Sequence, residues 1–598
     1  MHSPQIFADL RIVATSDVHM NITGWDALRD QTVPGRGMDV LATLIAHARA
    51  TAPGSCVLVD NGDVLQGAPI GDVCAAVDSA VPHPWPAILN ALRYDVVGLG
   101  NHDFDYGIPF LERIVAQTRA PTLCASFSKG GVTGVLPTTL LRRDIQCSDG
   151  TTQKLAIGAT SILPPQTAFW NDRYLSGYVA FQTGKAAAQR AVSQLRAQGA
   201  DIVLVLCHSG LPATGDDDEN FANTIAHEVD GIDAMVLGHT HQHFPKAGGP
   251  TDLNGVPAVM PGFGADVLGQ IDLRLGWTTA GWHVAHHSAQ LRRPTGQTAA
   301  DTAITALAAP ALAQTRAQLN RVLTRSDTDV HSYFGMLRTG PCDALVARAM
   351  TGALAAHVAG TDLAALPCLA SVAPMALGGR AGPQNFVEVP AGPVRARHIA
   401  MLTPYPNGIW GAVLSGAELW RWAERSAAFF GPGLDRSNRL VNLDAPSFNF
   451  DMLHGLETVI DPFRPAMFDP LGRRVDSTGH RVRALMRNGV AIEEDAQFLV
   501  AMTSYRGAGG GNFPGLYDDQ TILRTTLDLR VALHDEVAQN GVPQDISGSV
   551  WQFETDPGQR VVIETSPNAA AYINEIASFA PEVIGENAAG FLEVSVAI

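Results

Sequence analysis

Five short apolar runs in this chain each end directly in residues that can bind a metal ion. The runs with their polar endings are ATSDVH, LVDNGD, GLGNHD, VLCHSG and VLGHTH. Each run is typical of a buried strand, and parallel strands of one sheet carry the loops at their carboxyl ends to one edge. We therefore expect the runs to lie in one sheet and their polar residues to gather at its edge: Asp17, His19, Asp63, Asn101, His102, His208, His239 and His241.

This set of side chains favours a pair of divalent transition metals. Carboxylate, carboxamide and imidazole groups together suit Zn, Mn, Co or Fe, and the sequence does not choose among them. Two such ions keep a net positive charge beside two carboxylates, which attracts phosphate, and they lower the pKa of bound water to roughly 7. The sequence thus predicts a bimetallic phosphoesterase with these ligands: Asp17, His19, Asp63 (as a bridge), Asn101, His208, His239 and His241.

Three histidines follow one another at alternate positions in the last of these segments. His241 lies two residues after His239, so both imidazoles point to the same side if the segment is extended. Such a loop serves either two metals or one metal and the substrate. His243 continues the spacing, but the ligand set is complete without it, so we interpret it as a polar loop residue. His227 is interpreted as part of a helix surface.

His102 directly follows the predicted ligand Asn101. Adjacent residues on an extended loop point apart, so His102 is expected to face the substrate when Asn101 faces a metal. Asp105 is placed to keep the imidazole protonated and oriented, for stabilising phosphoryl oxygens or protonating the departing oxygen. Asp103 is the alternative partner. We predict a catalytic pair of His102 and Asp105.

Composition limits the partners of the chain. Its 598 residues carry a formal net charge of -17, which opposes binding to nucleic acid polymers or anionic membrane surfaces and favours small phosphorylated substrates. The 7 cysteines include no Cys-x-x-Cys pair, so no zinc ribbon is indicated. No obligate protein partner is evident. Neither an export signal nor a membrane span is found, which predicts a cytoplasmic protein, or a periplasmic one if the true start carries a signal.

The sequence pattern changes along the chain. Strand-like and helix-like runs alternate from Leu10 to about Leu275, as expected for an α/β domain. Residues 301–323 are rich in Ala, Gln and Arg and predict a connecting helix interrupted near Pro310. Beyond Ser326, a helical run and strands separated by long Gly- and Pro-rich loops predict a second, α+β domain. The predicted bounds are 9–295, 296–326 for the linker helix, and 327–598.

The motifs resemble those of a known family. Asp-x-His, Gly-Asp-x-x-Gln-Gly, Gly-Asn-His-Asp and Gly-His-Thr-His are similar to those of the calcineurin-like metallophosphoesterases and their 5'-nucleotidase branch. SVAPMALGGRAGP, FNFDMLHGLETVID and SYRGAGGGNFPG resemble the bacterial 2',3'-cyclic-nucleotide 2'-phosphodiesterase/3'-nucleotidases. The resemblance implies a four-layer metallophosphoesterase sandwich, a nucleoside-binding α+β domain and an active site in the cleft between them. In such enzymes a metal-activated hydroxide opens the cyclic nucleotide to a 3'-nucleotide, and a second hydrolysis releases phosphate.

The resemblance also implies how the nucleoside is held. The base is expected between two aromatic rings, Phe450 and Tyr505, with Phe448 as the alternative to Phe450. If the two phenylalanines belong to a strand, they share a face and one or both pack in the core. Stacking accepts any base, so base preference is expected to be broad. Further predicted contacts are Arg380, Asn407, Arg506 and Gly510.

Two positions depart from related enzymes. Gly511 stands where 5'-nucleotidases usually have the aspartate that holds the ribose hydroxyls, and Ser504 replaces the asparagine typical of the cyclic-nucleotide family. The first change favours substrates other than 5'-monophosphates. The alternatives are a 5'-nucleotidase or nucleotide-sugar hydrolase and, more remotely, a nucleotide-binding protein without turnover. The family is typically periplasmic, in contrast to the missing signal sequence.

Overall fold

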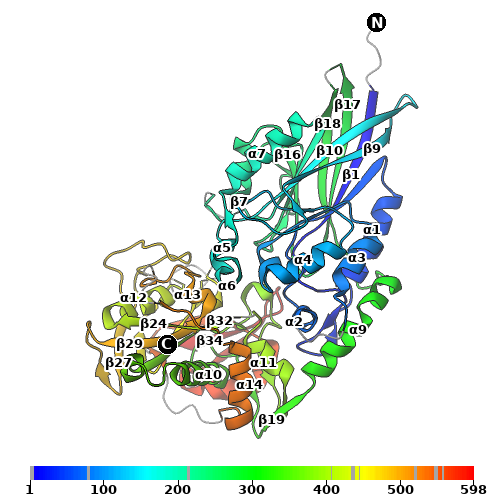
Figure 1. Ribbon diagram of the computed structural model, residues 1–598. Coiled ribbons are helices and arrows are strands. Elements are labelled where there is room, and N and C mark those ends of the chain that lie inside the picture. The colour runs from blue at the N-terminus through cyan, green and yellow to red at the C-terminus, as the bar shows by residue number, and fades with distance from the viewer. Residues whose placement is uncertain are drawn as a thin grey trace. The chain divides into compact units, whose positions relative to one another are not determined.

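The chain divides between Ala317 and Gln318 into two structural units, each described here by itself (Figure 1). Within the described residues, no helix combines the length and the apolar character needed to cross a bilayer. The computed structural model describes residues 6–76, 81–211, 216–279, 281–405, 407–431, 438–442, 445–516, 522–543, 550–554 and 558–598, except the side chain of residue 380.

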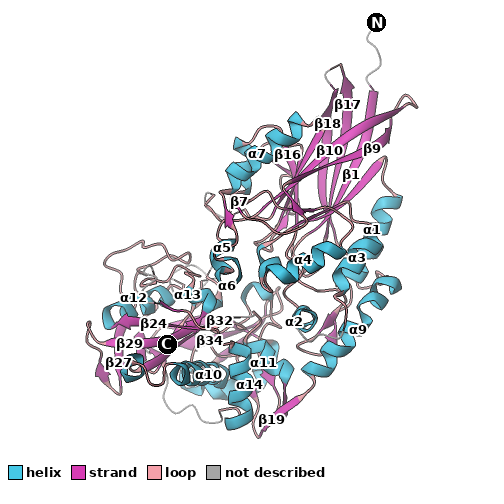
Figure 2. Cartoon of the chain, viewed as in Figure 1, coloured by secondary structure: helices cyan, strands magenta, loops and turns pink. Residues whose placement is uncertain are grey.

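In its described residues, the first unit contains two seven-stranded sheets (Figure 2). The first has the order β18 (Gly281–Arg292), β17 (Leu268–Thr278), β1 (Ile6–Thr15), β4 (Ser55–Asp60), β5 (Val96–Gly98), β6 (Thr122–Leu123) and β8 (Val135–Leu136). The second has the order β14 (His243–Phe244), β16 (Val256–Pro261), β13 (Ala234–Leu237), β12 (Ile202–Cys207), β10 (Thr152–Ile162) and β9 (Thr138–Gln146), with β15 (Asp252–Leu253) paired to β16.

All five predicted strands form, but they belong to two sheets. Strands β1, β4 and β5 are parallel neighbours in the first sheet, and β12 and β13 are parallel neighbours in the second. The prediction of a single sheet was wrong, because an apolar run shows that a strand is covered on both faces but not which strand lies beside it. The polar loops still meet, since the carboxyl ends of both strand sets lie at the same end of the unit.

Alternating side chains divide the first unit into four layers. In β1, Ile12 packs between the two sheets, whereas Val13 packs against the helices outside the first sheet. In β12, Leu204 packs between the sheets and Val205 packs against the helices outside the second. The predicted four-layer sandwich is confirmed. Its outer layers are α1 (Met38–Ala50), α3 (Pro84–Leu92) and α4 (Ile108–Gln117) on one side, and α7 (Gly184–Ala197) and α8 (Ala222–Glu228) on the other.

Helix α9 (Thr302–Leu319) follows the sheets and packs on the first unit. Ile304, Ala308 and Ala311 are buried in the same core as the residues of α1, α3 and α4. The helix continues through Pro310, so the predicted interruption there was wrong. The division at Ala317 falls inside the predicted linker 296–326, whose bounds stay a prediction.

The second unit combines helices with three larger sheets in its described residues, as expected for an α+β domain. The five-stranded sheet has the order β25 (Met452–His454), β21 (Cys368–Val372), β29 (Gln497–Thr503), β24 (Ile409–Ser415) and β30 (Ile522–Leu523). The others are β28 (Val490–Ala491), β27 (Val482–Arg487), β26 (Glu457–Ile460) and β31 (Trp551–Phe553), and β32 (Arg560–Thr565), β34 (Leu592–Ala597) and β33 (Glu582–Glu586). The longer helices are α10 (Pro341–His357), α12 (Gly416–Ala427) and α14 (Leu529–Asn540).

A buried histidine at the start of α3 makes the stability of the first unit depend on pH. His83 accepts a hydrogen bond from the backbone N–H of Trp85, and burial lowers its pKa from 6.5 to about 3. Below about pH 6.5 the unfolded chain binds a proton that folded His83 does not, so the free energy of unfolding falls as pH falls. The contribution is complete above pH 6.5, and we expect about 2 kcal/mol of it to be lost at pH 5.

His83→Asn keeps an acceptor at the start of the helix and removes this proton uptake. Urea unfolding of chelator-treated protein at pH 7.5 and pH 5 is therefore expected to show a smaller loss in the variant than in the unsubstituted protein. His227→Asn, at an exposed position of α8, is the control and should leave the pH dependence unchanged. An equal loss in His83→Asn would contradict the assignment.

Candidate metal centre

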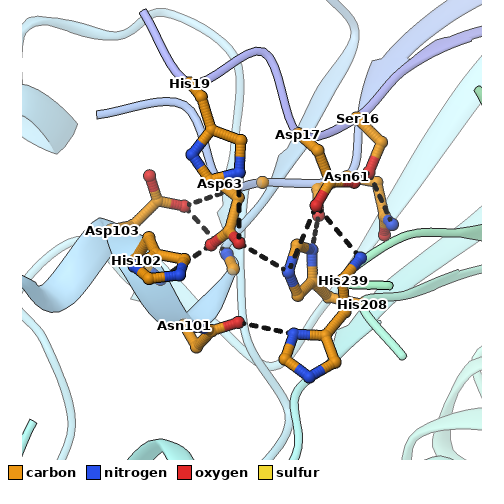
Figure 3. A network of polar contacts seen from close by, with 12 residues as sticks. Ser16, Asp17, His19, Asn61, Asp63, Asn101, His102, Asp103, His208 and His239 are labelled. Atoms are coloured by element: carbon orange, nitrogen blue, oxygen red, sulfur yellow. Dashed lines mark hydrogen bonds and ion pairs between the residues drawn. The ribbon is translucent and has the colours of Figure 1, made fainter. Parts of the chain in front are cut away.

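The structure brings all seven predicted ligands together where the predicted strands end. Figure 3 labels all of them except His241. The side chains form two groups, and within each group the possible ligand atoms lie within 4.8 Å of one another. We call them the Asp17 group, with His19 and His241, and the Asp63 group, with His208 and His239. Asn101 joins the second group, because its Oδ1 lies 2.9 Å from His239 Nδ1.

The backbone at the ligands is strained. Positive φ angles are uncommon for residues other than glycine and cost energy that the surrounding structure must supply. Five ligands have them: Asp17 (51°), His19 (47°), Asp63 (56°), His239 (71°) and His241 (58°). The segment after β13 is therefore kinked, and the prediction that its two histidines point to the same side of an extended chain was wrong. The loop still contributes a histidine to each of the two groups, which is the first of the two alternatives expected for it.

Glycines in two of the motifs allow the loops to approach closely. A Cβ atom at Gly238 would lie 2.6 Å from Oδ2 of Asp17, and one at Gly100 would lie 2.1 Å from Oδ1 of Asp63. Any larger residue would displace a predicted ligand. These contacts explain why glycine precedes His239 and Asn101 in the Gly-His-Thr-His and Gly-Asn-His-Asp motifs.

Hydrogen bonds behind the histidines fix which ring nitrogen faces the site. Nδ1 of His19 lies 2.8 Å from the carbonyl oxygen of Gln66, and Nδ1 of His208 lies 2.8 Å from that of Asn61. A carbonyl oxygen only accepts, so each Nδ1 carries the hydrogen and each Nε2 presents a lone pair. His239 has an oxygen at each ring nitrogen, with Oε1 of Glu219 2.9 Å from Nε2 and Oδ1 of Asn101 2.9 Å from Nδ1. The charged carboxylate is the stronger acceptor, so it favours the hydrogen on Nε2 and leaves Nδ1 for a cation.

In the Asp17 group, Nε2 of His241 lies 3.1 Å from Nε2 of His19, which accepts in this tautomer. In the Asp63 group, two atoms that only accept in these tautomers lie face to face, with 3.0 Å between His208 Nε2 and Asp63 Oδ2. The last two atoms are buried and form no hydrogen bond. Burial, the largest influence, lowers the pKa of His208, but Asp63 and Asp17 together raise it to about 10. The site thus demands positive charge, and the residues fit a divalent cation in each group.

The Asp63 carboxylate lies between the two groups. Its Oδ2 is 3.0 Å from His208 Nε2 and 3.8 Å from His19 Nε2, so it approaches one histidine of each group. This position supports the predicted bridging role of Asp63. The side chain is 1% exposed, which shields these charges from water and strengthens their interaction.

His102 and Asp105 form the predicted contact, with 2.9 Å between Nδ1 and Oδ2. The segment is the 3-10 helix η1 (Asn101–Phe104) and not the extended loop expected. With three residues per turn, a 3-10 helix places positions three apart on one side, which explains the pairing. Burial lowers the pKa of His102, but Asp105 and Asp63 outweigh it and raise the pKa to about 9. The two carboxylates therefore favour the charged form of His102.

Asp103, the alternative partner for His102, has another role. Its carboxylate accepts hydrogen bonds from the backbone N–H groups of Asp63, Val64, Leu65 and Gly100, at 2.8 to 3.1 Å. The side chain thus ties the loop after β4 to the loop after β5. Burial and the nearby Asp63 raise its pKa to about 6.

In the second unit the two candidate phenylalanines are not equivalent. They lie at η4 (Ser447–Asn449) and just after it, not on a strand, so they do not share a face. Phe450 is 1% exposed and packs on Phe429 and Trp551, with ring centroids 5.1 Å away in both cases. Phe448 is 37% exposed, and its ring lies 6.4 Å from that of Tyr505 at 85°. Stacking of a base by Phe450 is incompatible with this burial, and Phe448 takes its place as the candidate.

Arg506 supports the turn after β29 and does not present its charge to a substrate, which corrects the prediction. It is 4% exposed, and its guanidinium binds both oxygens of Asp451 at 2.7 and 2.9 Å. The remaining donors contact Asn449 Oδ1 and the carbonyl oxygens of Phe448 and Gly510. All five donors of the group are thereby engaged.

The other predicted contacts surround Tyr505. Oδ1 of Asn407 accepts from the backbone N–H of Tyr505 at 3.3 Å and from the Ser504 hydroxyl at 3.4 Å. A Cβ atom at Gly510 would lie 2.5 Å from the Tyr505 ring, so glycine there allows the ring its position. Asn407 and Gly510 thus act on the tyrosine in this structure. The side chain of Arg380 lies outside the described residues.

Gly511 has no room for the aspartate of the 5'-nucleotidases. Its φ is +76°, and a Cβ atom would lie 2.2 Å from Nη1 of Arg506 and 2.3 Å from Oδ1 of Asn449. Any side chain at this position requires rearrangement of the buried Arg506. The packing around the turn therefore leaves no space for an aspartate at position 511.

Two histidines interpreted as non-ligands lie outside both groups. His243 belongs to β14 and its Nε2 is 3.3 Å from Oδ2 of Asp266. His227 lies on α8 with its side chain exposed. The sequence interpretation missed Glu219, although the acidic run DDDE that contains it follows the ligand His208 in the same loop.

Comparison with known proteins agrees with this architecture. The family description "Calcineurin-like phosphoesterase" matches residues 10–243, and "5'-nucleotidase, C-terminal domain" matches residues 323–518. The chain is 33% identical to the 2',3'-cyclic-nucleotide 2'-phosphodiesterase/3'-nucleotidase of Salmonella typhimurium, over 98% of this chain and 95% of that protein. It is 28% identical to the trifunctional nucleotide phosphoesterase protein YfkN of Bacillus subtilis, over 94% of this chain but only 40% of that protein.

A solved structure shows the same fold. A putative 5'-nucleotidase from Staphylococcus aureus aligns with a TM-score of 0.71 over 91% of this chain and 100% of that one, at 20% identity. The fold and the site define a calcineurin-like metallophosphoesterase that continues into a 5'-nucleotidase-type second domain. Within that class, the chain belongs to the 2',3'-cyclic-nucleotide 2'-phosphodiesterase/3'-nucleotidase family, because identity to such a relative extends over nearly its whole length.

The four hydrogen bonds to Asp103 predict that it controls metal affinity without touching the metal. In Asp103→Asn one oxygen becomes an NH₂ group that faces backbone donors, so the loop carrying Asp63 loosens. We expect metal affinity to fall about 10- to 100-fold. Metal content after dialysis against graded chelator, measured by mass spectrometry, checks this. Asp105→Asn is the matched control, since Asp105 contacts His102 and not the loop, and it should keep its metal. Equal retention by both variants would contradict the role.

Proposed function

We propose that this chain is a metal-dependent hydrolase that opens 2',3'-cyclic nucleotides to 3'-nucleotides and then releases phosphate from the 3'-nucleotide. The observation that carries the proposal is the pair of ligand groups with the His102–Asp105 pair beside them. The choice of substrate comes from the relative in Salmonella typhimurium, whose name states both activities. Small nucleotides are accordingly the partners of the chain.

Divalent ions would be held by the Asp17 group and by the Asp63 group with Asn101, and when bound they supply positive charge for the phosphate and a water of lowered pKa. The protein fixes the ligands before the substrate arrives. Three of the four histidines are held from behind by Gln66, Asn61 or Glu219, and Asp103 holds the loop of Asp63. Such preorganisation avoids the cost of arranging the charges during the reaction.

His102 is the proposed catalytic residue of the chain itself. Its ring centroid lies 5.5 Å from that of the ligand His19, and Asp105 on Nδ1 keeps the imidazole oriented and charged. Opening the cyclic phosphate breaks the bond to the 2' oxygen, which needs a proton as it leaves. The second hydrolysis makes the same demand at the 3' oxygen. A positioned imidazolium meets this demand and stabilises the phosphoryl oxygens.

Phe448 and Tyr505 are the proposed base-stacking pair. Their rings are perpendicular, so a base stacks on one ring and meets the other by edge, or one ring turns to enclose it. Stacking on an aromatic ring contributes about 1 to 3 kcal/mol per base and does not depend on which base is bound. Broad base preference follows. The packed Gly511, which leaves no space for a ribose-binding aspartate, favours 3' and cyclic substrates over 5'-monophosphates.

Product analysis by chromatography tests the function. The protein is incubated with 2',3'-cAMP, 3'-AMP or 5'-AMP, each with added Mn²⁺ and each with chelator. We expect turnover of the first two, little turnover of 5'-AMP, and loss of all turnover with chelator, because the ligand groups require cations. Preferential hydrolysis of 5'-AMP would identify the chain as a 5'-nucleotidase, and metal-dependent binding without any product would identify a binding protein.

The variant His102→Ala is the control for this experiment. It removes the proposed proton donor but none of the ligands, so kcat should fall by about 10²- to 10⁴-fold while metal content stays unchanged. Activity equal to that of the unsubstituted protein would exclude His102 as the proton donor. Loss of metal from the variant would overturn the catalytic role of His102.

Because the two phenylalanines are unequally buried, we expect their alanine variants to differ in KM and in the free energy of unfolding. Phe448→Ala removes an exposed ring, so KM for 3'-AMP should rise about 5- to 100-fold with little change in the free energy of unfolding. Phe450→Ala opens a cavity in the core and should lower the free energy of unfolding by about 3 to 5 kcal/mol. Kinetics and urea unfolding of both variants check this. An unchanged KM in Phe448→Ala would exclude it from base binding.

A further inference from the structure

We propose that Glu219 is a positioning residue that fixes His239 for the cation of the Asp63 group, so that this group and not the Asp17 group depends on residues 217–221 before α8. The inference rests on the metal site and is independent of which nucleotide is the substrate. The carboxylate contacts the ligand histidine directly, with 2.9 Å between Oε1 and Nε2.

The contact decides which nitrogen of His239 faces the site. Both ring nitrogens face an acceptor, because Oδ1 of Asn101 lies 2.9 Å from Nδ1 and Oε1 of Glu219 lies 2.9 Å from Nε2. The charged carboxylate accepts the stronger hydrogen bond, so it favours the hydrogen on Nε2 and leaves the lone pair on Nδ1 for a cation. Without the acceptor, the hydrogen is free to move to Nδ1, where it would donate to Asn101 and occupy the position of a cation. A carboxylate behind a ligand histidine also makes the imidazole a more basic ligand.

The backbone around Glu219 is anchored on both sides. The Ser209 hydroxyl donates to the carbonyl oxygen of Glu219 at 2.8 Å and accepts from the N–H of Phe221 at 2.9 Å. Oδ1 of Asp217 accepts from the N–H of Glu219 at 2.9 Å. Since Ser209 directly follows the ligand His208, the same loop carries one ligand of the group and orients another.

A second segment holds the same imidazole from its face. Trp170, at the end of α5 (Thr167–Trp170), stacks on His239 with 5.4 Å between ring centroids and 22° between planes. The next residue, Asn171, donates from Nδ2 to the carbonyl oxygen of Asn101 at 3.0 Å. Trp170 thus fixes the plane of the ring, and Glu219 fixes its rotation within that plane.

The Asp17 group is supported differently. His19 contacts the carbonyl oxygen of Gln66, and His241 stacks on Phe263 with 4.7 Å between centroids and 13° between planes. These supports belong to segments other than the loop of Glu219. A change at Glu219 is therefore expected to act on one of two cations. The side chain is 41% exposed, so its replacement leaves no cavity in the core.

If the contact between Glu219 and His239 were only a structural ion pair, a different result would be expected. An exposed pair contributes little to stability and is screened by salt. Loss of such a pair would leave the binding of both cations unchanged, whereas loss of a positioning residue separates the two affinities. The number of tightly bound ions is thus a readout that a structural role does not move.

The test is titration of the metal-free full chain with Mn²⁺, followed by calorimetry and by electron paramagnetic resonance of the bound ions. The unsubstituted protein is expected to take up two ions. In Glu219→Ala one affinity should fall about 10- to 100-fold while the other stays unchanged, and the signal of a coupled pair should be lost at stoichiometric metal. Glu219→Gln keeps a neutral acceptor of the same shape and should lie between the two.

Asp218→Asn is the matched control, because it removes the same charge from the neighbouring exposed position and should behave as the unsubstituted protein. The proposal would be overturned if Glu219→Ala left both metal affinities unchanged. It would also be overturned if Glu219→Ala and Asp218→Asn lowered both affinities equally, because that result indicates an effect of charge alone. The titration contains no nucleotide, so its result can be interpreted even if the proposed hydrolase activity is not found.

Discussion

The first unit depends on holding atoms that repel one another in a buried space. Asp17, Asp63 and His208 are essentially inaccessible to water, and their acceptor atoms lie 3 to 4 Å apart. Such an arrangement is unfavourable without positive charge, because burial removes the water that would otherwise screen the repulsion between these acceptor atoms. The sandwich supplies the rigidity: two sheets packed through residues such as Ile12 and Leu204 hold the strand ends, and the loops accept left-handed backbone.

Much of the support comes from residues outside the two ligand groups. Asp103 fastens one ligand loop through backbone N–H groups, and carbonyl oxygens or a carboxylate hold the histidines from behind. The residues that hold the histidines differ between the two groups, so each ligand group is supported by its own set of contacts. In the second unit a comparable division separates Phe448, exposed beside Tyr505, from Phe450, which is part of the core.

The sequence allowed the candidate ligands to be selected because each lies within a few residues of a strand end, where local order fixes position. The pairing of His102 with Asp105 was predictable for the same reason, although its cause is a 3-10 helix and not an extended loop. The choice between Phe448 and Phe450 was not predictable, since Phe450 is covered by Trp551, about a hundred residues away in the sequence. Arg506 was misjudged on equal grounds, because its partner Asp451 is distant in sequence.

The sequence by itself therefore determined the class of chemistry, the identity of the candidate ligands and the presence of two domains. These follow from local patterns: apolar runs that form strands, and polar residues placed directly after them. Only the tertiary structure decided that the strands form two sheets, that His239 and His241 serve different groups, and that Glu219 lies behind His239. Such facts depend on which surfaces pack together, and packing joins residues whose separation along the chain carries no signal.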